Sequence, residues 1–303
     1  MPDLMLTSDT SVTRNQPFQL MSARAMFQLT KFRLSFVVAF SSAIGYILGS
    51  PGPANWQNSG LVLLGGFLIS ASANMINQML EKDLDKLMKR TANRPLPTGQ
   101  VSVPEVVVLC LVTGLGGLAL LAFQFNWLSA ILSLISLVLY GFVYTPMKRI
   151  SPISVLIGAF PGALPPLIGY VAASGQITNE ALILFGIQFV WQFPHFWAIA
   201  WVLDEDYKAA GFKMLPFGGS KDMKTAIQIM SYTMLLIPLS LLPLKMGMTG
   251  TTSALVVVTC SVLFLMQTFY LMRTCSKKAA LNIMFGSFLY LPVVQIAYVL
   301  DKI

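Results

Sequence analysis

The fold is decided by residues 73–97, which read ANMINQMLEKDLDKLMKRTANRPLP. In this stretch an apolar segment runs directly into acidic residues and then into a basic cluster. In a helix that turns about 100° per residue, Asn77, Glu81 and Asp85 share one face, whereas Asp83 points elsewhere. Three oxygen-bearing side chains on one face suit a hard cation such as Mg²⁺. A cation beside a basic cluster suits a diphosphate.

The rest of the chain has the composition of a membrane protein. Its 303 residues are 55% hydrophobic and only 11% charged, and the mean hydropathy is +0.71. These values exclude an ordinary soluble core and predict a polytopic membrane protein. Apolar runs long enough to cross a bilayer can be marked off between charges and turn signals. We predict nine spans, at about residues 34–50, 58–80, 104–124, 127–146, 152–173, 179–203, 224–244, 250–272 and 279–300.

The basic residues test this count, because they fall in alternate connections. Eighteen of the 20 Lys and Arg residues lie in the N-terminal segment and in the second, fourth, sixth and eighth connections; Lys245 and Lys302 are the exceptions. The positive-inside rule places those connections and the N-terminus in the cytoplasm, and the C-terminus on the opposite side. The net charge of +8 is therefore mainly a topology signal that also favours anionic lipid. Nucleic-acid binding is not expected, since the basic residues are divided among short loops.

The chain leaves no room for a soluble domain of useful size. We predict a disordered tail at residues 1–16 and a single membrane-embedded domain at residues 17–303, in which residues 17–33 can form an interfacial helix. The three cysteines show no metal-type spacing. The predicted fold is therefore all-α, a bundle of nine transmembrane helices.

A second acidic cluster, Asp204, Glu205 and Asp206, ends the sixth predicted span. Like the first cluster, it lies at a cytoplasmic helix end and is followed by basic residues and a Leu-Pro. Charged residues at a helix end often mark the membrane interface and nothing more. Two acidic clusters on the same side gain nothing from an anionic leaflet, however, and a bound divalent ion would compensate them.

The sixth span also carries polar residues, in the sequence GIQFVWQFPHFWAIAW at 186–201. Gln188, Gln192 and His195 are spaced to share one helix face. His195 is the only histidine, and burying it in a membrane favours a functional role. The same span contains three tryptophans, Trp191, Trp197 and Trp201. They form either an aromatic belt at the interface or a pocket for a flat aromatic ligand.

The fourth connection and the fifth span hold further candidates. Lys148 and Arg149 either reach a phosphate or carboxylate or serve only as topology markers. Glycines and prolines in the fifth span break or kink its helix and leave small residues where a neighbour or a ligand can approach. These are Gly158, Pro161, Gly162, Pro165 and Pro166.

Two groups of motifs resemble a known family. Asn77-x3-Glu81-x3-Asp85, followed by Arg90-Thr-x-x-Arg94-Pro-Leu, resembles the first acidic motif of the UbiA-type intramembrane prenyltransferases. That family usually has Asp in place of Glu81, and spaced aspartates in place of the contiguous acids at 204–206.

A narrower resemblance is to the haem-modifying branch of that family, the protohaem IX farnesyltransferases. It rests on these motifs: Trp191-Gln-Phe-Pro-His195-Phe, Glu205-Asp206-Tyr207, Gly211-x-x-Met214, Tyr144-Thr-Pro with Lys148-Arg149, and Gly162-Ala-x-Pro-Pro.

The resemblance implies a central cavity that opens toward the bilayer, with Mg²⁺-diphosphate held between the two acidic motifs at its cytoplasmic end. It implies farnesyl transfer from farnesyl diphosphate to a vinyl group of haem B, with addition of water to give haem O. It assigns Mg²⁺ to Asn77, Glu81, Asp85 and Asp206. It assigns substrate contacts to Arg90, Arg94, Lys148, Arg149, Gln192, His195, Glu205 and Tyr207. The implied location is a bacterial inner membrane, with haem A synthase or terminal-oxidase assembly factors as partners.

Three alternatives remain open on the sequence. A UbiA-type enzyme with another acceptor, such as 4-hydroxybenzoate or a quinone precursor, does not account for the His195 segment. A transporter or channel would also have broken helices, but the acidic clusters lie at one interface rather than at mid-membrane. A non-catalytic haem-carrying scaffold would explain His195 but not the paired acidic clusters.

Overall fold

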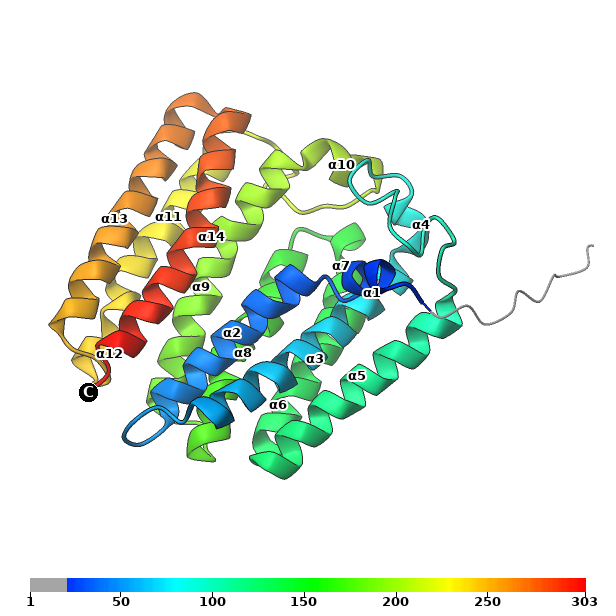
Figure 1. Cartoon of the computed structure of the whole chain (residues 1–303). Helices are drawn as coiled ribbons and strands as arrows, with labels where there is room; N and C mark the ends of the chain where they lie inside the picture. Colours follow the sequence, from blue (N-terminus) through cyan, green and yellow to red (C-terminus); the bar gives the residue numbers. More distant parts are fainter. Residues whose placement is uncertain (1–20) are drawn as a thin grey trace, which may run out of the picture.

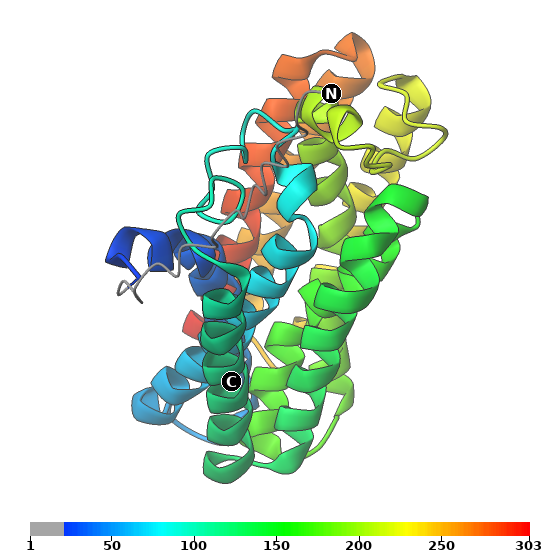
Figure 2. The ribbon, with the colours of Figure 1, turned by 90° about the vertical axis from the view of Figure 1, so that its right-hand side faces the viewer.

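The computed structural model describes residues 21–303, and the predicted tail at residues 1–16 lies outside the described part. Within residues 21–303, nine helices are long and apolar enough to cross a membrane, which confirms the predicted count. They run up and down the molecule (Figures 1 and 2). The elements are α1 Ala23–Leu29, α2 Phe32–Gly49, α3 Trp56–Leu80, α4 Lys82–Asp85, α5 Val103–Gln124, α6 Trp127–Val138, the π-helix η1 Leu139–Tyr144, α7 Thr145–Ile150, α8 Ser154–Ser174, α9 Asn179–Val202, α10 Asp204–Ala209, α11 Met223–Ser240, α12 Leu242–Lys245, α13 Thr251–Thr274 and α14 Lys277–Leu300.

Most spanning helices begin at a polar residue that caps their free N–H groups. Asn126 accepts from the backbone N–H of Ser129 at 2.8 Å at the start of α6. Ser102 and Glu105 form a capping box at the start of α5. Further side-chain caps are Asn55 for α3, Thr178 for α9, Asp222 for α11 and Ser276 for α14. These caps divide the long apolar sequence into separate spans, because each satisfies N–H groups that the helix cannot pair internally.

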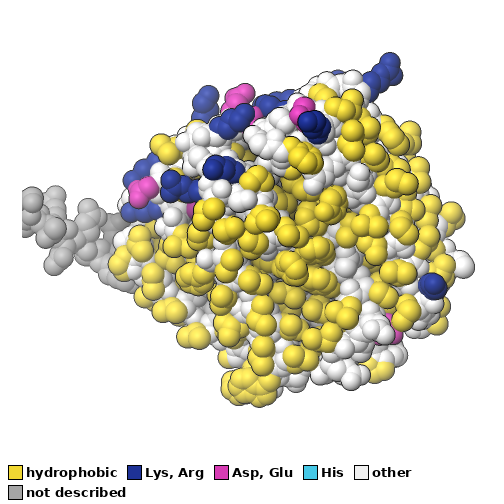
Figure 3. Space-filling model, turned by 180° about the vertical axis from the view of Figure 1, so that it is seen from behind, with side chains coloured by type: hydrophobic (Ala, Val, Ile, Leu, Met, Phe, Trp, Pro, Cys, Tyr) yellow, Lys and Arg dark blue, Asp and Glu magenta, His cyan; other side chains and the backbone are white. Residues whose placement is uncertain are grey.

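The helices form two groups that meet along α8, α9, α2 and α14 (Figure 1). In the first group, α2 packs against both α3 and α8, and α5 and α6 cover the outside. In the second group, α9 packs against α11 and α14, and α13 packs against both of these on the outer side. The outer helices expose large apolar side chains such as Val112 and Leu255. Figure 3 shows a broad hydrophobic belt with Lys and Arg gathered at one end of the molecule, as expected for a protein embedded in a bilayer.

Helix α8 continues through its three prolines without interruption. The prolines therefore do not end the helix, and their effect is on its backbone hydrogen bonds. Because Pro165 and Pro166 lack N–H groups, the carbonyls four residues earlier lose their helical partners. The Pro161 carbonyl accepts instead from Ser136 Oγ at 3.2 Å. The Gly162 carbonyl accepts from Gln188 and Gln192, at 2.8 and 3.0 Å. The carbonyls that the prolines leave free thus accept hydrogen bonds from polar side chains of neighbouring spans inside the membrane.

The fourth span changes helix type before it ends, passing from α6 through η1 to α7. The π-helical turn keeps Thr145 Oγ1 bonded to the Tyr140 carbonyl at 2.9 Å. The short helix α7 that follows carries Lys148, which is buried, and Arg149, which is exposed. A π-helical turn inside an α-helix often accompanies a functional site, and here it directs two tyrosines and a lysine toward the end of α3.

Candidate active site

The first acidic motif lies where α3 ends and α4 begins. Glu81 is the C-cap of α3, and the i to i+4 hydrogen bonds continue through it, from Glu81 N to Asn77 O at 3.0 Å and from Asp85 N to Glu81 O at 2.7 Å. The three side chains are therefore stacked, and they are only 2%, 5% and 0% exposed for Asn77, Glu81 and Asp85. Asp83 points to solvent and pairs with Lys86 at 2.8 Å. The predicted division of the four residues by helix face is confirmed.

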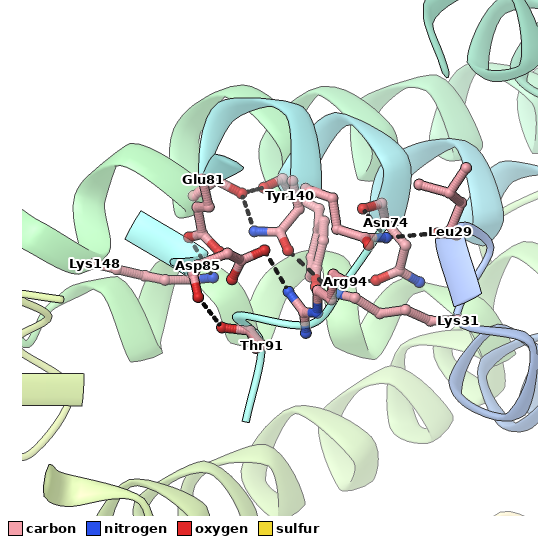
Figure 4. Close-up of polar contacts among 12 residues, drawn as sticks. Leu29, Lys31, Asn74, Glu81, Asp85, Thr91, Arg94, Tyr140 and Lys148 are labelled. Carbon is pink, nitrogen blue, oxygen red and sulfur yellow. Dashed lines mark hydrogen bonds and ion pairs between the residues drawn. The ribbon is translucent and has the colours of Figure 1, made fainter. Parts of the chain in front are cut away.

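Each buried carboxylate of this motif pairs with one basic side chain. Glu81 Oε1 accepts from Lys148 Nζ at 2.8 Å, and Asp85 Oδ2 accepts from Arg94 Nη1 at 2.7 Å (Figure 4). Lys148 also lies over the rings of Tyr144 and Phe212, at 4.7 and 5.5 Å from their centroids. These pairs hold charge in a region where an unpaired ion would be costly.

Lys31 completes the basic set and was not among the predicted site residues. Its Nζ donates to Asn77 Oδ1 at 3.1 Å, and Figure 4 shows it approaching the end of α3 from the side opposite Lys148. It lies between α1 and α2 with left-handed backbone, φ 44°, which is uncommon for a residue other than glycine. Burial, together with the positive charges of Arg94 and Lys148, lowers the pKa of Lys31 to about 7. A strained backbone that directs a partly buried amine into a charged cluster points to a function.

The second acidic motif meets the first at the same end of the bundle, where α4 and α10 are neighbours (Figures 1 and 2). Asp206 Oδ2 accepts from the Arg90 backbone N–H at 3.4 Å. The backbone N–H of Lys213, just beyond α10, donates to the Lys148 carbonyl at 2.6 Å. Burial raises the pKa of Tyr207, and the positive charges of Arg90 and Lys148 lower it by a smaller amount. The two clusters therefore form one charged region at the mouth of the bundle.

The three acids at 204–206 have different surroundings. Asp204 is buried and forms ion pairs with Lys208 and Lys221 at 2.9 and 3.0 Å, so it stabilises its own loop. Glu205 is exposed. Asp206, which contacts the Arg90 loop, is therefore placed best of the three to act together with the first motif.

Two of the predicted basic residues do not enter the cluster as closely as Arg94 and Lys148 do. The side chains of Arg90 and Arg149 are exposed. Arg149 follows Lys148 directly in α7, and consecutive residues of a helix point about 100° apart, so only one of the two can face Glu81. The structure does not bring Arg149 into the site.

The donor set fits a hard divalent cation by its chemistry. Asn77, Glu81, Asp85 and Asp206 offer amide and carboxylate oxygens, which Mg²⁺ prefers. Asp85 Oδ1 is buried and has no hydrogen-bond partner among residues 21–303, so one ligand position is already available. In this part of the chain no three His, Cys, Asp or Glu residues are grouped closely enough to hold a metal. In the structure Glu81 pairs with Lys148 and Asp85 pairs with Arg94, so each carboxylate has a basic partner.

A cavity of about 210 Å³ lies next to this charged region, inside the bundle. Its lining is mainly apolar and comes from α2, α3, α6, α8, α9 and α14. It reaches Asn74, one helical turn before Asn77, and Tyr140, whose hydroxyl lies 3.5 Å from Asn74 Oδ1. The predicted central cavity is confirmed, and Asn74 and Tyr140 are the lining residues that lie toward the charged region.

His195 and Trp191 form an aromatic wall of the cavity. Their rings stack with centroids 4.4 Å apart and an interplanar angle of 20°. Gln192 also lines the cavity, whereas Trp197 and Trp201 are buried in the core between helices. The sequence left two interpretations of the tryptophans, an aromatic belt at the interface or a pocket for a ligand. Trp191 lines a pocket, whereas Trp197 and Trp201 belong to neither arrangement.

Residues outside the predicted set hold the predicted residues in place. Asn77 Nδ2 donates to Thr145 Oγ1 at 3.2 Å, and Thr91 Oγ1 donates to the Asp85 carbonyl at 2.8 Å. Nothing in the sequence distinguished Lys31 from the exposed basic residues that flank it, or these threonines from ordinary helix-end residues.

The fold and the site together define a polytopic membrane protein with an internal cavity and a charged mouth. The sequence profile of the UbiA prenyltransferase family matches residues 38–291. A protoheme IX farnesyltransferase of Cytophaga hutchinsonii is 56% identical over 280 residues, which cover 92% of this chain and 98% of the relative. The chain therefore belongs to the UbiA prenyltransferase family.

Solved structures show the same fold. A digeranylgeranylglyceryl phosphate synthase matches with a TM-score of 0.76 at 21% identity, over 92% of this chain and 97% of that one. A UbiA homologue from Archaeoglobus fulgidus, bound to DMAPP and Mg²⁺, matches with a TM-score of 0.66 at 18% identity, over 90% of this chain and 99% of the homologue. The predicted fold class is confirmed.

Proposed function

We propose that this chain transfers the farnesyl group of farnesyl diphosphate to a vinyl group of haem B, with addition of water, to give haem O. The high identity to a protoheme IX farnesyltransferase over nearly its whole length supports this activity. The observation that carries it is the meeting of two acidic motifs at the mouth of an apolar cavity walled by Trp191 and His195. Such a site has one end for a diphosphate and another for a flat aromatic acceptor.

The mouth binds the diphosphate end of the donor in this proposal. Asn77, Glu81, Asp85 and Asp206 would hold Mg²⁺, with Glu205 at the outer edge. When bound, Mg²⁺ supplies positive charge that neutralises the diphosphate as it leaves. Lys31, Arg94 and Lys148 turn from their present acidic or amide partners toward the phosphate oxygens, and Arg90 covers them from the solvent side.

The cavity binds the farnesyl chain and the reacting vinyl group. The C–O bond of the donor breaks with its electron pair leaving on the diphosphate, and the vinyl group forms a C–C bond to the first farnesyl carbon. Water then adds to the remaining cation and loses a proton. The apolar lining protects the allylic cation from earlier capture by water. Trp191, Gln192 and His195 line the part of the cavity that would hold the porphyrin, and Tyr207 belongs to the charged mouth.

The direct test is a reaction of the purified protein with Mg²⁺, farnesyl diphosphate and haem B, followed by mass spectrometry. We expect the porphyrin to gain the mass of a farnesyl group plus water. A product formed with 4-hydroxybenzoate, and none with haem B, would instead establish a UbiA-type enzyme with another acceptor. Release of intact farnesyl diphosphate and unmodified haem from the protein would rule out catalysis.

Lys31 should contribute to binding of the diphosphate. Because hydrogen bonds to charged groups are worth more than neutral ones, we expect Lys31→Met to raise the KM for farnesyl diphosphate about tenfold. The matched control is Arg33→Met, two residues further on, whose side chain is exposed. Initial rates measured over a range of donor concentrations would show the difference, and equal KM values for the two variants would remove Lys31 from the site.

His195 should serve the acceptor rather than the donor. We expect His195→Ala to weaken haem B binding about tenfold or more while farnesyl diphosphate binding stays within about twofold. Absorbance titration measures the first and calorimetry the second. Trp197→Phe, on the same helix but outside the cavity, should change neither affinity. A larger loss of donor affinity than of haem affinity would overturn this placement of the acceptor.

The distribution of charge supports one orientation in the membrane. Lys and Arg gather at the end of the bundle that carries both acidic motifs, and the positive-inside rule supports placing that end in the cytoplasm. In this arrangement the active-site mouth opens to the cytoplasm, and the last residues of α14 lie on the opposite side.

A further inference from the structure

Ser287, in α14, makes two polar contacts with the aromatic wall on α9. Its backbone carbonyl accepts from Trp191 Nε1 at 3.1 Å, and its hydroxyl lies 2.9 Å from His195 Nδ1. Ser287 is 0% exposed. A single buried residue of a neighbouring span thus holds both rings by hydrogen bonds.

The direction of the hydrogen bond to His195 follows from the single proton of a hydroxyl group. Ser287 Oγ lies 2.7 Å from the Met284 carbonyl, which can only accept, and this shorter contact favours placing the single serine proton there. With that proton directed to the Met284 carbonyl, Ser287 Oγ accepts from His195, and His195 Nδ1 is the protonated nitrogen. A neutral imidazole has one N–H, which leaves Nε2 with a free lone pair.

That lone pair belongs to a ring fixed on the cavity wall. His195 lines the cavity, and among residues 21–303 its Nε2 has no hydrogen-bond partner. Trp191 stacks on one side of the ring, and Phe288 meets it edge-on with centroids 5.2 Å apart. An unprotonated imidazole nitrogen whose other nitrogen is held by a hydrogen bond is the form in which histidine binds metals.

We infer that Ser287 is a positioning residue for the acceptor, holding His195 as the Nδ1–H tautomer so that Nε2 binds the iron of haem B. This inference rests on the proposed function, in which haem B is the substrate. It assigns to the serine of α14 the part that carbonyl or carboxylate partners play behind many metal-binding histidines. It also gives the protein a way to distinguish haem from an iron-free porphyrin of the same shape.

The experiment compares two porphyrins without farnesyl diphosphate present. The purified membrane protein is titrated with haem B and, separately, with iron-free protoporphyrin IX, and the haem complex is examined by absorption and electron paramagnetic resonance spectroscopy. We expect the unmodified protein to bind haem B more tightly, with the spectrum of an imidazole ligand. Ser287→Ala should weaken haem B binding about tenfold, change the ligand spectrum and leave protoporphyrin affinity unchanged.

Two further variants separate positioning from packing. Ser287→Thr keeps the hydroxyl and should restore the spectrum. Ser261→Ala removes a buried serine of α13 that bonds Tyr290 Oη at 3.0 Å, away from His195, and should leave haem binding as it was. A Ser287→Ala protein with unchanged spectrum and haem affinity would overturn the inference, and so would equal affinity of the unmodified protein for the two porphyrins.

Failure of this inference is distinguishable from failure of the proposed function. The same preparations are assayed for farnesylated haem by mass spectrometry. Product formation without an imidazole–iron signature contradicts only the role of Ser287 and His195 at the iron. Absence of product from the unmodified protein contradicts the activity itself.

Discussion

Turnover should fall about a thousandfold when Asp85 is replaced by Asn or Glu81 by Gln, while the protein remains folded in the membrane. Both variants keep the shape of the side chain and an oxygen that can accept from Arg94 or Lys148, at the positions where those contacts are now 2.7 and 2.8 Å. They remove the negative charge that a divalent cation requires. The loss should therefore appear in catalysis and in the Mg²⁺ dependence, and not in the yield of folded protein.

The matched control lies inside the same motif. Asp83→Asn changes a carboxylate whose side chain is 85% exposed and whose partner is Lys86, and we expect activity within about twofold of the unmodified protein. Initial rates at several Mg²⁺ concentrations, with size-exclusion chromatography of each variant, provide the comparison. If Asp85→Asn and Glu81→Gln kept nearly normal rates, the proposed metal site would have to be abandoned.

A second large effect is expected where α2 and α8 pack backbone to backbone. A Cβ at Gly45 would overlap the carbonyl oxygen of Pro166, and a Cβ at Gly169 would overlap the carbonyl oxygen of Ser42. Backbone atoms have no alternative rotamer, so the two helices would have to move apart. We expect Gly169→Ala to destabilise the protein by about 3 kcal/mol and to reduce the amount of folded protein.

The comparison variant is Gly186→Ala in α9, where a Cβ would meet no atom within 4 Å. It should leave stability unchanged or slightly raised, because alanine favours a helix over glycine. Thermal unfolding followed by fluorescence-detected size-exclusion chromatography measures both variants. Equal unfolding temperatures would show that the α2–α8 contact tolerates more separation than the structure indicates.

The same contact forms part of the cavity wall, since Ser42 and Pro165 line the cavity. A loss of stability here should therefore also reduce activity.

The two acidic motifs show how far local sequence information reaches. The helix period alone separated Asp83 from Asn77, Glu81 and Asp85, since side-chain direction within one helix is set by a fixed rotation per residue. The same argument could not separate Lys148 from Arg149. Both are basic residues at one helix end, and only the packing of α7 against α3 decides which of them is buried beside Glu81.

The cavity residues show a similar limit. The spacing of Gln188, Gln192 and His195 placed them on one face, but it did not indicate what each would contact. Gln188 and Gln192 bond a carbonyl of α8 that is free because Pro166 has no N–H, and His195 bonds a serine 92 positions away in the chain. These partners come from other spans, so no local pattern contains them.

The sequence by itself determined the properties that depend on neighbouring residues: nine apolar spans, the helices they form, the side of the bundle where charge collects and the face on which the first acidic motif lies. Tertiary structure alone decided which distant residues complete the site. Lys31 reaches Asn77 across 46 positions and Lys148 reaches Glu81 across 67. The physical reason is that hydrophobicity and helix periodicity act along the chain, whereas these ion pairs and hydrogen bonds form between side chains that only the packing of whole helices brings together.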